Sequence, residues 1–180
     1  MQRYNLTAAM YDGRYAEEQK AKYKAALKSV KVAGAVVLDV GCGSGLFFQQ
    51  IAANASIVVG VDISHKLLVK AKENARSFGN VSVLQADADH LPFKDGPFDA
   101  VFAFTVLQNM PKPSETLHEV KKVAKQDGRL VVTALKKAFA LPIFMDLIEG
   151  GGFTVVSFVD DEGLKCYVSV LALNMLTSAT

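Results

Sequence analysis

Short apolar runs alternate with helical patterns along most of this 180-residue chain. The apolar runs predict strands near 35–40, 57–62, 81–85, 98–104 and 129–135, followed by a pair near 153–160 and 166–173. Apolar residues spaced three and four apart predict helices near 45–53, 64–77, 114–125 and 141–149. Such alternation is typical of a parallel sheet with helices on both faces.

Local signals refine this pattern. Ser64 and Ser114 each precede an apolar stripe and are expected to cap helices, while Pro142 suits the first turn of the last helix. Only residues 161–164 separate the last two strands, which is too short for a crossover helix, so these strands must be antiparallel. We therefore predict an α/β fold with a doubly wound, seven-stranded sheet, in which five parallel strands are closed by an antiparallel C-terminal hairpin.

Residues 1–34 differ from the part that follows. Between Ala21 and Lys31, the residues Tyr23, Leu27 and Val30 have helical spacing, which predicts a helix packed along the sheet. An aromatic and basic segment precedes it, with Arg3, Tyr4, Tyr11, Arg14 and Tyr15. We predict that 1–34 form a helical arm over a ligand site and that 35–180 form the single main domain.

The stretch from Val37 to Leu46 carries the strongest chemical signal. An apolar strand runs into three glycines at alternate positions, Gly41, Gly43 and Gly45, and then into a helical pattern. Glycines allow a sharp turn and leave no Cβ between the main chain and a ligand. Seventeen residues after Gly45, the next strand ends in Asp62, where a carboxylate can accept both hydroxyls of an adenosine ribose. Together these features predict a nucleoside-cofactor site.

The charge near this turn narrows the choice of cofactor. The dinucleotide fingerprint is G-x-G-x-x-G, whereas this chain has G-x-G-x-G with Asp39 two residues before the first glycine. A carboxylate there opposes a pyrophosphate but suits an ammonium or a sulfonium.

This stretch closely resembles the first motif of class I methyltransferases, which use S-adenosylmethionine (SAM). Residues 85–93 resemble the segment after strand 3 in the ubiquinone/menaquinone-biosynthesis (type 11) group, and residues 98–107 resemble strand 4 and its exit. The resemblance implies a Rossmann-like fold, SAM as cofactor and S-adenosylhomocysteine as product. The cofactor-binding residues that it implies are Asp39, Gly41, Cys42, Gly43, Gly45, Asp62, Ile63, Asp87, Ala88, Phe104, Thr105 and the N-terminal Tyr11.

No catalytic residue can be assigned from the sequence. Many family members carry a histidine after strand 4, but here the place is taken by Gln108-Asn109-Met110, in which Asn109 either orients a substrate or caps a local turn. Two carboxylates and an imidazole within residues 87–90 cannot converge on one ion, so we predict no metal. The three histidines, for which we favour surface or structural roles, are His65, His90 and His118.

Three hypotheses for the acceptor stay open. In the first, the protein is a methyltransferase that acts on RNA through an open basic mouth. In the second, it is a methyltransferase that acts on a small metabolite under a lid formed by the arm or a partner. In the third, it is a SAM-binding module without activity that supports a partner enzyme. The cations expected at the mouth are Arg3, Arg14, Lys66, Lys112, Lys136 and Lys137.

Composition adds two expectations. No run of 18 apolar residues and no signal-peptide pattern appears, and the two cysteines have no metal-ligand spacing, so we expect a cytoplasmic protein without a membrane span. The helix at 141–148 is apolar nearly all round, which predicts either burial on two sides or a surface for a partner subunit, a second copy of the chain or an apolar substrate.

Overall fold

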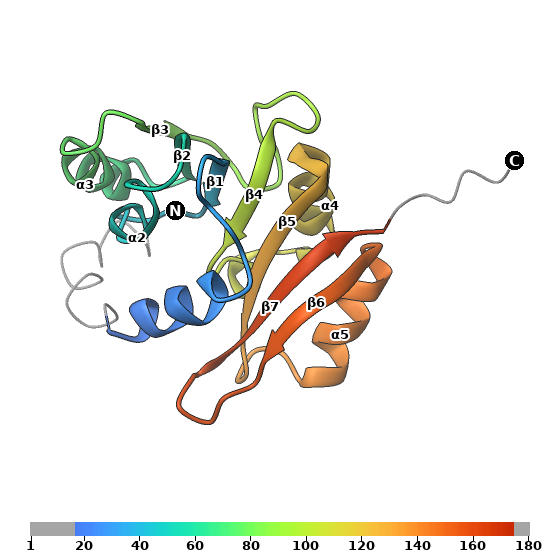
Figure 1. The fold of residues 1–180 in the computed structure, drawn as a ribbon. Helices are drawn as coiled ribbons and strands as arrows, with labels where there is room; N and C mark the ends of the chain where they lie inside the picture. Colours follow the sequence, from blue (N-terminus) through green and yellow to red (C-terminus); the bar gives the residue numbers. More distant parts are fainter. Residues whose placement is uncertain (1–16, 175–180) are drawn as a thin grey trace, which may run out of the picture.

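A seven-stranded sheet runs through the computed structural model, which describes residues 17–174 (Figure 1). Its strand order is β3-β2-β1-β4-β5-β7-β6. Strands β1 to β5 pair in parallel, whereas β7 runs antiparallel to both of its neighbours, β5 and β6. The strands are β1 (Val36–Val40), β2 (Ile57–Asp62), β3 (Val81–Gln85), β4 (Phe98–Ala103), β5 (Ala124–Leu135), β6 (Phe153–Val159) and β7 (Cys166–Leu173). The predicted fold is thereby confirmed.

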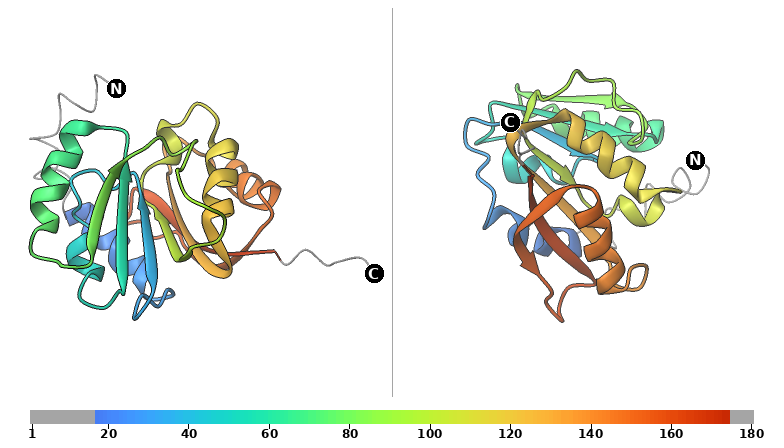
Figure 2. Two further views of the ribbon diagram at one scale, coloured as in Figure 1. Left: turned by 90° about the horizontal axis from the view of Figure 1, so that it is seen from above. Right: turned by 90° about the vertical axis from the view of Figure 1, so that its right-hand side faces the viewer.

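Helices cover both faces of this sheet (Figure 2). They are a helical segment at 17–27, α2 (Phe48–Ile51), α3 (His65–Ala75), α4 (Pro113–Val123) and α5 (Leu141–Gly150), with a 3₁₀ turn, η1 (Leu107–Asn109). Because side chains alternate along a strand, Val37 and Phe102 pack in a core with 17–27, α2 and α3, whereas Leu38 and Val101 pack with α4 and α5. Two apolar cores thus hold one sheet.

Several predicted boundaries need correction. The helix expected at 45–53 is a single turn, Phe48–Ile51, and the left-handed conformation of Gly45 delays its start. Ser64 caps α3, its Oγ accepting from the Leu67 N–H at 3.4 Å, but Ser114 is not a cap. Lys112 takes that position because Pro113, which needs no hydrogen-bond partner for its nitrogen, begins α4. Strand β5 begins at Ala124, earlier than expected, where α4 has just ended.

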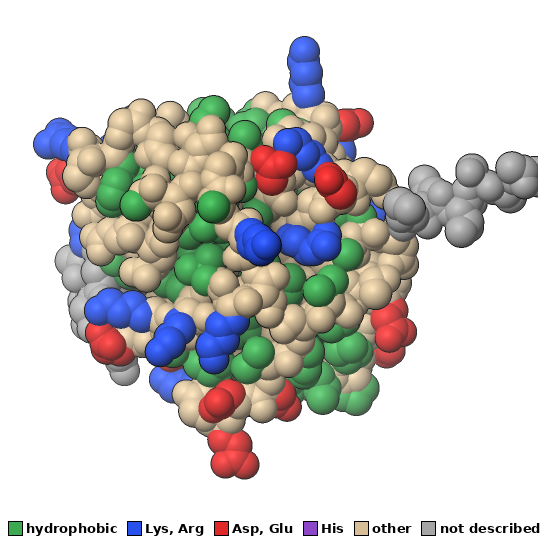
Figure 3. Space-filling model, viewed as in Figure 1, with side chains coloured by type: hydrophobic (Ala, Val, Ile, Leu, Met, Phe, Trp, Pro, Cys, Tyr) green, Lys and Arg blue, Asp and Glu red, His purple; other side chains and the backbone are tan. Residues whose placement is uncertain are grey.

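Helix α5 is buried on one side only, so the expected burial on two sides is wrong. Phe144 and Ile148 are fully buried against the sheet, whereas Ile143 is 60% exposed. Hydrophobic side chains accordingly gather on the surface over α5, at the lower right of Figure 3. Within residues 17–174, no helix combines the length and the apolarity that crossing a membrane requires.

The topology also determines where a ligand can bind. Strands β1 and β4 are neighbours, although the chain builds β2 and β3 between them, so the direction of winding reverses at this pair. In open α/β sheets, ligands bind in the crevice at the carboxyl ends of the strands where this reversal occurs. The glycine turn at 41–45 follows β1 and Thr105 follows β4, so these two segments flank the crevice.

Candidate functional site

The turn after β1 can be built only with glycine. Gly41, Gly43 and Gly45 have φ angles of 68°, 57° and 81°, in the left-handed region that residues with a Cβ rarely adopt. There is also no room for a side chain, because a Cβ at Gly41 would lie 2.7 Å from Val106 and one at Gly45 would lie 2.5 Å from the ring of Phe48. Conformation and packing together leave the main chain of this turn bare.

Asp62, at the end of β2, ties the glycine turn to the start of α3. Its Oδ2 accepts from the Gly43 N–H at 2.9 Å, and its Oδ1 accepts from the Ser64 N–H at 2.8 Å. Burial raises the pKa of Asp62, and the amides that donate to its carboxylate oppose this shift. Asp62 also lines the large cleft described below. A carboxylate offers about four acceptor positions, and three main-chain amides donate to this one, so it retains capacity for a ligand hydroxyl.

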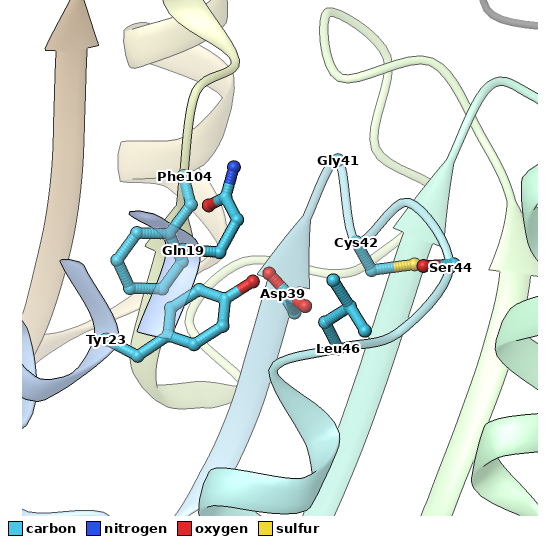
Figure 4. Close-up of a pocket in the computed structure, with 8 residues that line it drawn as sticks. All are labelled: Gln19, Tyr23, Asp39, Gly41, Cys42, Ser44, Leu46 and Phe104. Atoms are coloured by element: carbon cyan, nitrogen blue, oxygen red, sulfur yellow. The ribbon is translucent and has the colours of Figure 1, made fainter. Parts of the chain in front are cut away.

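Asp39 lies behind the same turn and is 2% exposed. It borders a small cavity between β1 and the 17–27 helix, into which the hydroxyl end of Tyr23 points toward the carboxylate (Figure 4). Burial, together with the nearby Asp62, raises the pKa of Asp39 well above its ordinary value. A carboxylate in such a place is stabilised by the arrival of a positively charged group.

Phe104 forms one wall of this small cavity and is fixed by other aromatic rings. Its ring centroid lies 4.8 Å from that of Tyr23 and 5.0 Å from that of Phe47, both with edge-to-face geometry. Tyr23 and Phe47 are themselves 4.7 Å apart. The cluster therefore holds the 17–27 helix against the exit of β4. The sequence predicted that Tyr23 packs along the sheet but did not indicate its contact with Phe104 at the site.

A larger open cleft, with a volume of about 1340 Å³, extends from Asp62 to Lys165. Of the predicted cofactor-binding residues, those lining the cleft are Gly41, Gly43, Asp62, Ile63, Asp87, Ala88, Phe104 and Thr105. Asp39 and Cys42 line the small cavity, which shares Gly41 and Phe104 with the cleft. Gly45 lines neither the cleft nor the small cavity, so it contributes only to the conformation of the turn. Tyr11 lies outside the described residues.

The turn after β3 contributes the acidic rim of the cleft. Asp87 Oδ1 accepts from the Asp89 N–H at 3.0 Å, and Asp89 in turn accepts a short hydrogen bond from the hydroxyl of Thr116 on α4. His90 is exposed and does not line the cleft. In the part of the chain that the structure describes, no three His, Cys, Asp or Glu side chains gather as a metal site would require.

Thr105, just after β4, has a φ of 62° and is the one residue other than glycine with a positive φ between residues 17 and 174. Its N–H donates to Thr133 Oγ1 at 2.8 Å, its Oγ1 accepts from Lys22 Nζ at 3.2 Å, and its carbonyl accepts from Asn109 Nδ2 at 2.9 Å and from Gln108. Such strain costs about 1–3 kcal/mol and persists only where the surroundings over-determine it. The amide of Asn109 thus stabilises the local turn, and the residue also lines the cleft, so its orientation of a substrate stays a prediction.

Lys22 is a site residue that the sequence did not suggest. It is 1% exposed, and its Nζ lies 3.1 Å from Glu18 Oε1, while Lys165 Nζ lies 3.0 Å from Glu18 Oε2. Burial alone would raise the pKa of Glu18, but the hydrogen bonds from Lys165 and Lys22 outweigh it and hold that pKa below its ordinary value. One sequence feature could have indicated the burial of Lys22: it lies on the same apolar face of the helix as Tyr23 and Ala26.

The two ends of the cleft therefore differ in charge. Asp62, Asp87 and Asp89 line the end at β2 and β3. The other end, at β5 and the 17–27 helix, is lined by Lys22, Lys136, Lys137, Lys165 and Glu18, which we call the lysine end. Of the mouth cations expected from the sequence, Lys136 and Lys137 reach the cleft, Lys66 and Lys112 do not line it, and Arg3 and Arg14 lie outside the described residues.

Known proteins share both the sequence pattern and the architecture. A family model described as a methyltransferase domain matches residues 38–132. A demethylmenaquinone methyltransferase of Tropheryma whipplei (strain Twist) is 35% identical over 124 residues, covering 67% of this chain and 52% of that protein. A ubiquinone biosynthesis O-methyltransferase of Xylella fastidiosa (strain 9a5c) is 31% identical over 131 residues, covering 71% of this chain and 52% of that protein. The chain thus spans about half the length of these curated relatives.

A solved structure supports the same architecture. A SAM-dependent methyltransferase from Aquifex aeolicus superposes with a TM-score of 0.81 at 20% identity, covering 93% of this chain and 97% of that one. At this level of identity, the likeness concerns the fold alone.

Proposed function

Since the chain belongs to the methyltransferase-domain family, we propose that it transfers the methyl group of SAM to a small-molecule acceptor bound in the cleft. One observation carries this proposal. The left-handed glycine turn, anchored by Asp62, presents bare main chain to the cleft at the point where the sheet reverses its winding.

The residues present fit SAM. A Cβ at Gly41 would collide with Val106, so the chain keeps the turn free of side chains on the side of the cleft. Asp62 would accept the ribose hydroxyls, and Ile63 and Ala88 would border the adenine. Asp39 would compensate the positive charge of the methionine part.

Methyl transfer needs little chemistry from the protein. When bound, SAM supplies a methyl group on a positively charged sulfur, which keeps the electron pair of the C–S bond as the acceptor's lone pair takes the methyl carbon. Thr105 and Phe104 are both held rigidly and would fix the direction in which the acceptor approaches the methyl group. Holding two reactants in the correct geometry can contribute about 7–11 kcal/mol to lowering a barrier.

A small acceptor suits the described rim better than RNA does. Lys112 pairs with Glu115 at 2.8 Å, and Asp87 and Asp89 line the cleft on that side, so the cations do not form a continuous track for a phosphate backbone. The names of the relatives, which refer to menaquinone and ubiquinone, also support a small acceptor. A cytoplasmic setting agrees with Cys42 and Cys166, which are both free and buried.

Calorimetric titration with SAM and S-adenosylhomocysteine tests the cofactor assignment. We expect saturable binding of both ligands, loss of binding in Asp62→Ala, and unchanged binding in Asp146→Ala, whose exposed carboxylate lies on α5 away from the cleft. Absence of binding to the wild-type chain would contradict the proposal. Binding without transfer to any acceptor in a broad panel would instead favour the SAM-binding module without activity.

A further inference from the structure

The lysine end of the cleft has an excess of positive charge. Four ammonium groups, those of Lys22, Lys136, Lys137 and Lys165, line this end. Glu18 is shared by Lys22 and Lys165, and Asp160 pairs with Lys136 at 2.6 Å. Two carboxylates therefore face four cations, which leaves a net positive charge where an acceptor would lie.

These cations come from segments that the fold fixes relative to one another. The Lys136 N–H donates to the Lys165 carbonyl at 3.0 Å, which joins the turn after β5 to the start of β7. Glu18 then links Lys165 to the 17–27 helix. Lys22 lies behind them and holds the side chain of Thr105, so the charged end is continuous with the wall nearest the cofactor site. The fold thus fixes Lys22, Lys136 and Lys165 in one cluster, and Lys137 follows Lys136 in the same turn.

We infer that the acceptor is a small molecule with an anionic group, for which a carboxylate is the simplest case, bound at the lysine end by Lys136, Lys137 and Lys165. The inference rests on the proposed function, because it assumes that the opposite end holds SAM. An anionic acceptor matches the positive charge of the lysine end, and such complementarity confers specificity.

Two small probes of nearly the same shape test this inference. The protein is first saturated with S-adenosylhomocysteine and then titrated with benzoate or with benzamide, which lacks the charge. Binding is followed by NMR through the backbone amides of residues 135–138 and 165. The test variant is Lys136→Gln with Lys137→Gln, and the matched control is Lys72→Gln with Lys94→Gln, which removes two exposed charges outside the cleft.

We expect benzoate to bind at least about tenfold more tightly than benzamide, as one charge-assisted contact predicts. This preference should fall clearly in the test variant, which retains Lys165 alone of the three lysines, persist in the control and weaken with added salt. Equal binding of the two probes, or no shift at 135–138 with either, would overturn the inference while leaving the cofactor assignment intact.

Two further outcomes separate this inference from its alternatives. A uridine dodecamer that bound more tightly than benzoate and displaced it would overturn the inference in favour of RNA. Failure of S-adenosylhomocysteine to bind would overturn the proposed function first, and the inference with it.

Discussion

The two ends of the cleft are built in different ways. At the cofactor end, a glycine turn and Asp62 are held by main-chain hydrogen bonds to Gly43 and Ser64, all within one βαβ unit. At the lysine end, Lys22 reaches Thr105, which is 83 residues away, and Glu18 reaches Lys165 through side chains alone. The contacts at the cofactor end are therefore local in sequence, whereas those at the lysine end join distant segments, mainly through side chains and also through the main-chain bond from Lys136 to Lys165.

This difference predicts how each end responds to mutation. At the cofactor end, the shape depends on residues that lack a side chain, so adding atoms should do the most harm. At the lysine end, the shape depends on hydrogen bonds to a strained residue, so removing single polar atoms should matter most.

Gly45→Ala should have the largest effect. The new Cβ would lie 2.5 Å from the ring of Phe48 at a φ of 81°, so overpacking and backbone strain add up to about 3 kcal/mol of lost stability. Two matched glycines separate the two causes in urea denaturation. Gly34→Ala, with a φ of 71° and open space, should lose about 1 kcal/mol, and Gly79→Ala, which has neither problem, should lose less than about 0.5 kcal/mol. Equal losses at all three glycines would refute this account of the turn.

Thr133→Val should come second, with a loss of about 2 kcal/mol. Thr133 is fully buried, and its Oγ1 accepts from the Thr105 N–H at 2.8 Å, so valine keeps the shape but leaves that amide without its partner. Thr133→Ser, which retains the hydroxyl, should preserve more of the stability and more of the methyl-transfer rate. If serine and valine had the same effect on the rate, Thr133 would not position Thr105.

The contrast between local and long-range contacts explains why the sequence predicted the cofactor end of the cleft better than the lysine end. Gly41, Gly43 and Asp62 could be found because their roles follow from local spacing and from the end of a strand. The strand positions and the antiparallel hairpin likewise follow from apolar runs and loop lengths, which are local quantities. Only the binding roles of these residues stay predictions.

The contacts of Lys22 could not be found in the same way. They depend on which face of the 17–27 helix meets the sheet and on the left-handed backbone at Thr105. Neither is encoded by spacing, since a threonine after a strand normally has a negative φ. The expected burial of α5 on two sides was wrong for a similar reason, because an apolar helix does not reveal how many of its sides the sheet will cover.

Asp39→Asn should have a smaller effect that depends on pH. Because burial raises the pKa of Asp39 in the folded state, the folded protein binds more protons than the unfolded chain above the ordinary carboxyl pKa. Wild-type stability should therefore fall as the pH rises through this range, and the asparagine variant should lack that decrease and be more stable at neutral pH. Thermal unfolding of both proteins between pH 4 and pH 8 measures this decrease in stability, and the lower limit lies at about the ordinary carboxyl pKa.

The same substitution should weaken SAM binding, by about tenfold or more, because the compensating charge is gone. The exposed Asp95→Asn should change neither property. A variant that was less stable at neutral pH, or that bound SAM normally, would contradict the role assigned to Asp39.

Lys165→Gln should have the smallest effect on stability and still separate the two ends of the cleft. Its side chain is 76% exposed, so its ion pair with Glu18 should contribute less than about 1 kcal/mol, similar to the exposed pair of Lys20 and Glu17. Lys20→Gln is therefore the matched control in urea denaturation. Only Lys165→Gln should weaken benzoate binding to the protein saturated with S-adenosylhomocysteine, because only Lys165 lines the cleft. A loss of stability as large as that of Thr133→Val would mean that the lysine end serves the fold, whereas a selective loss of benzoate binding would mean that it serves the acceptor.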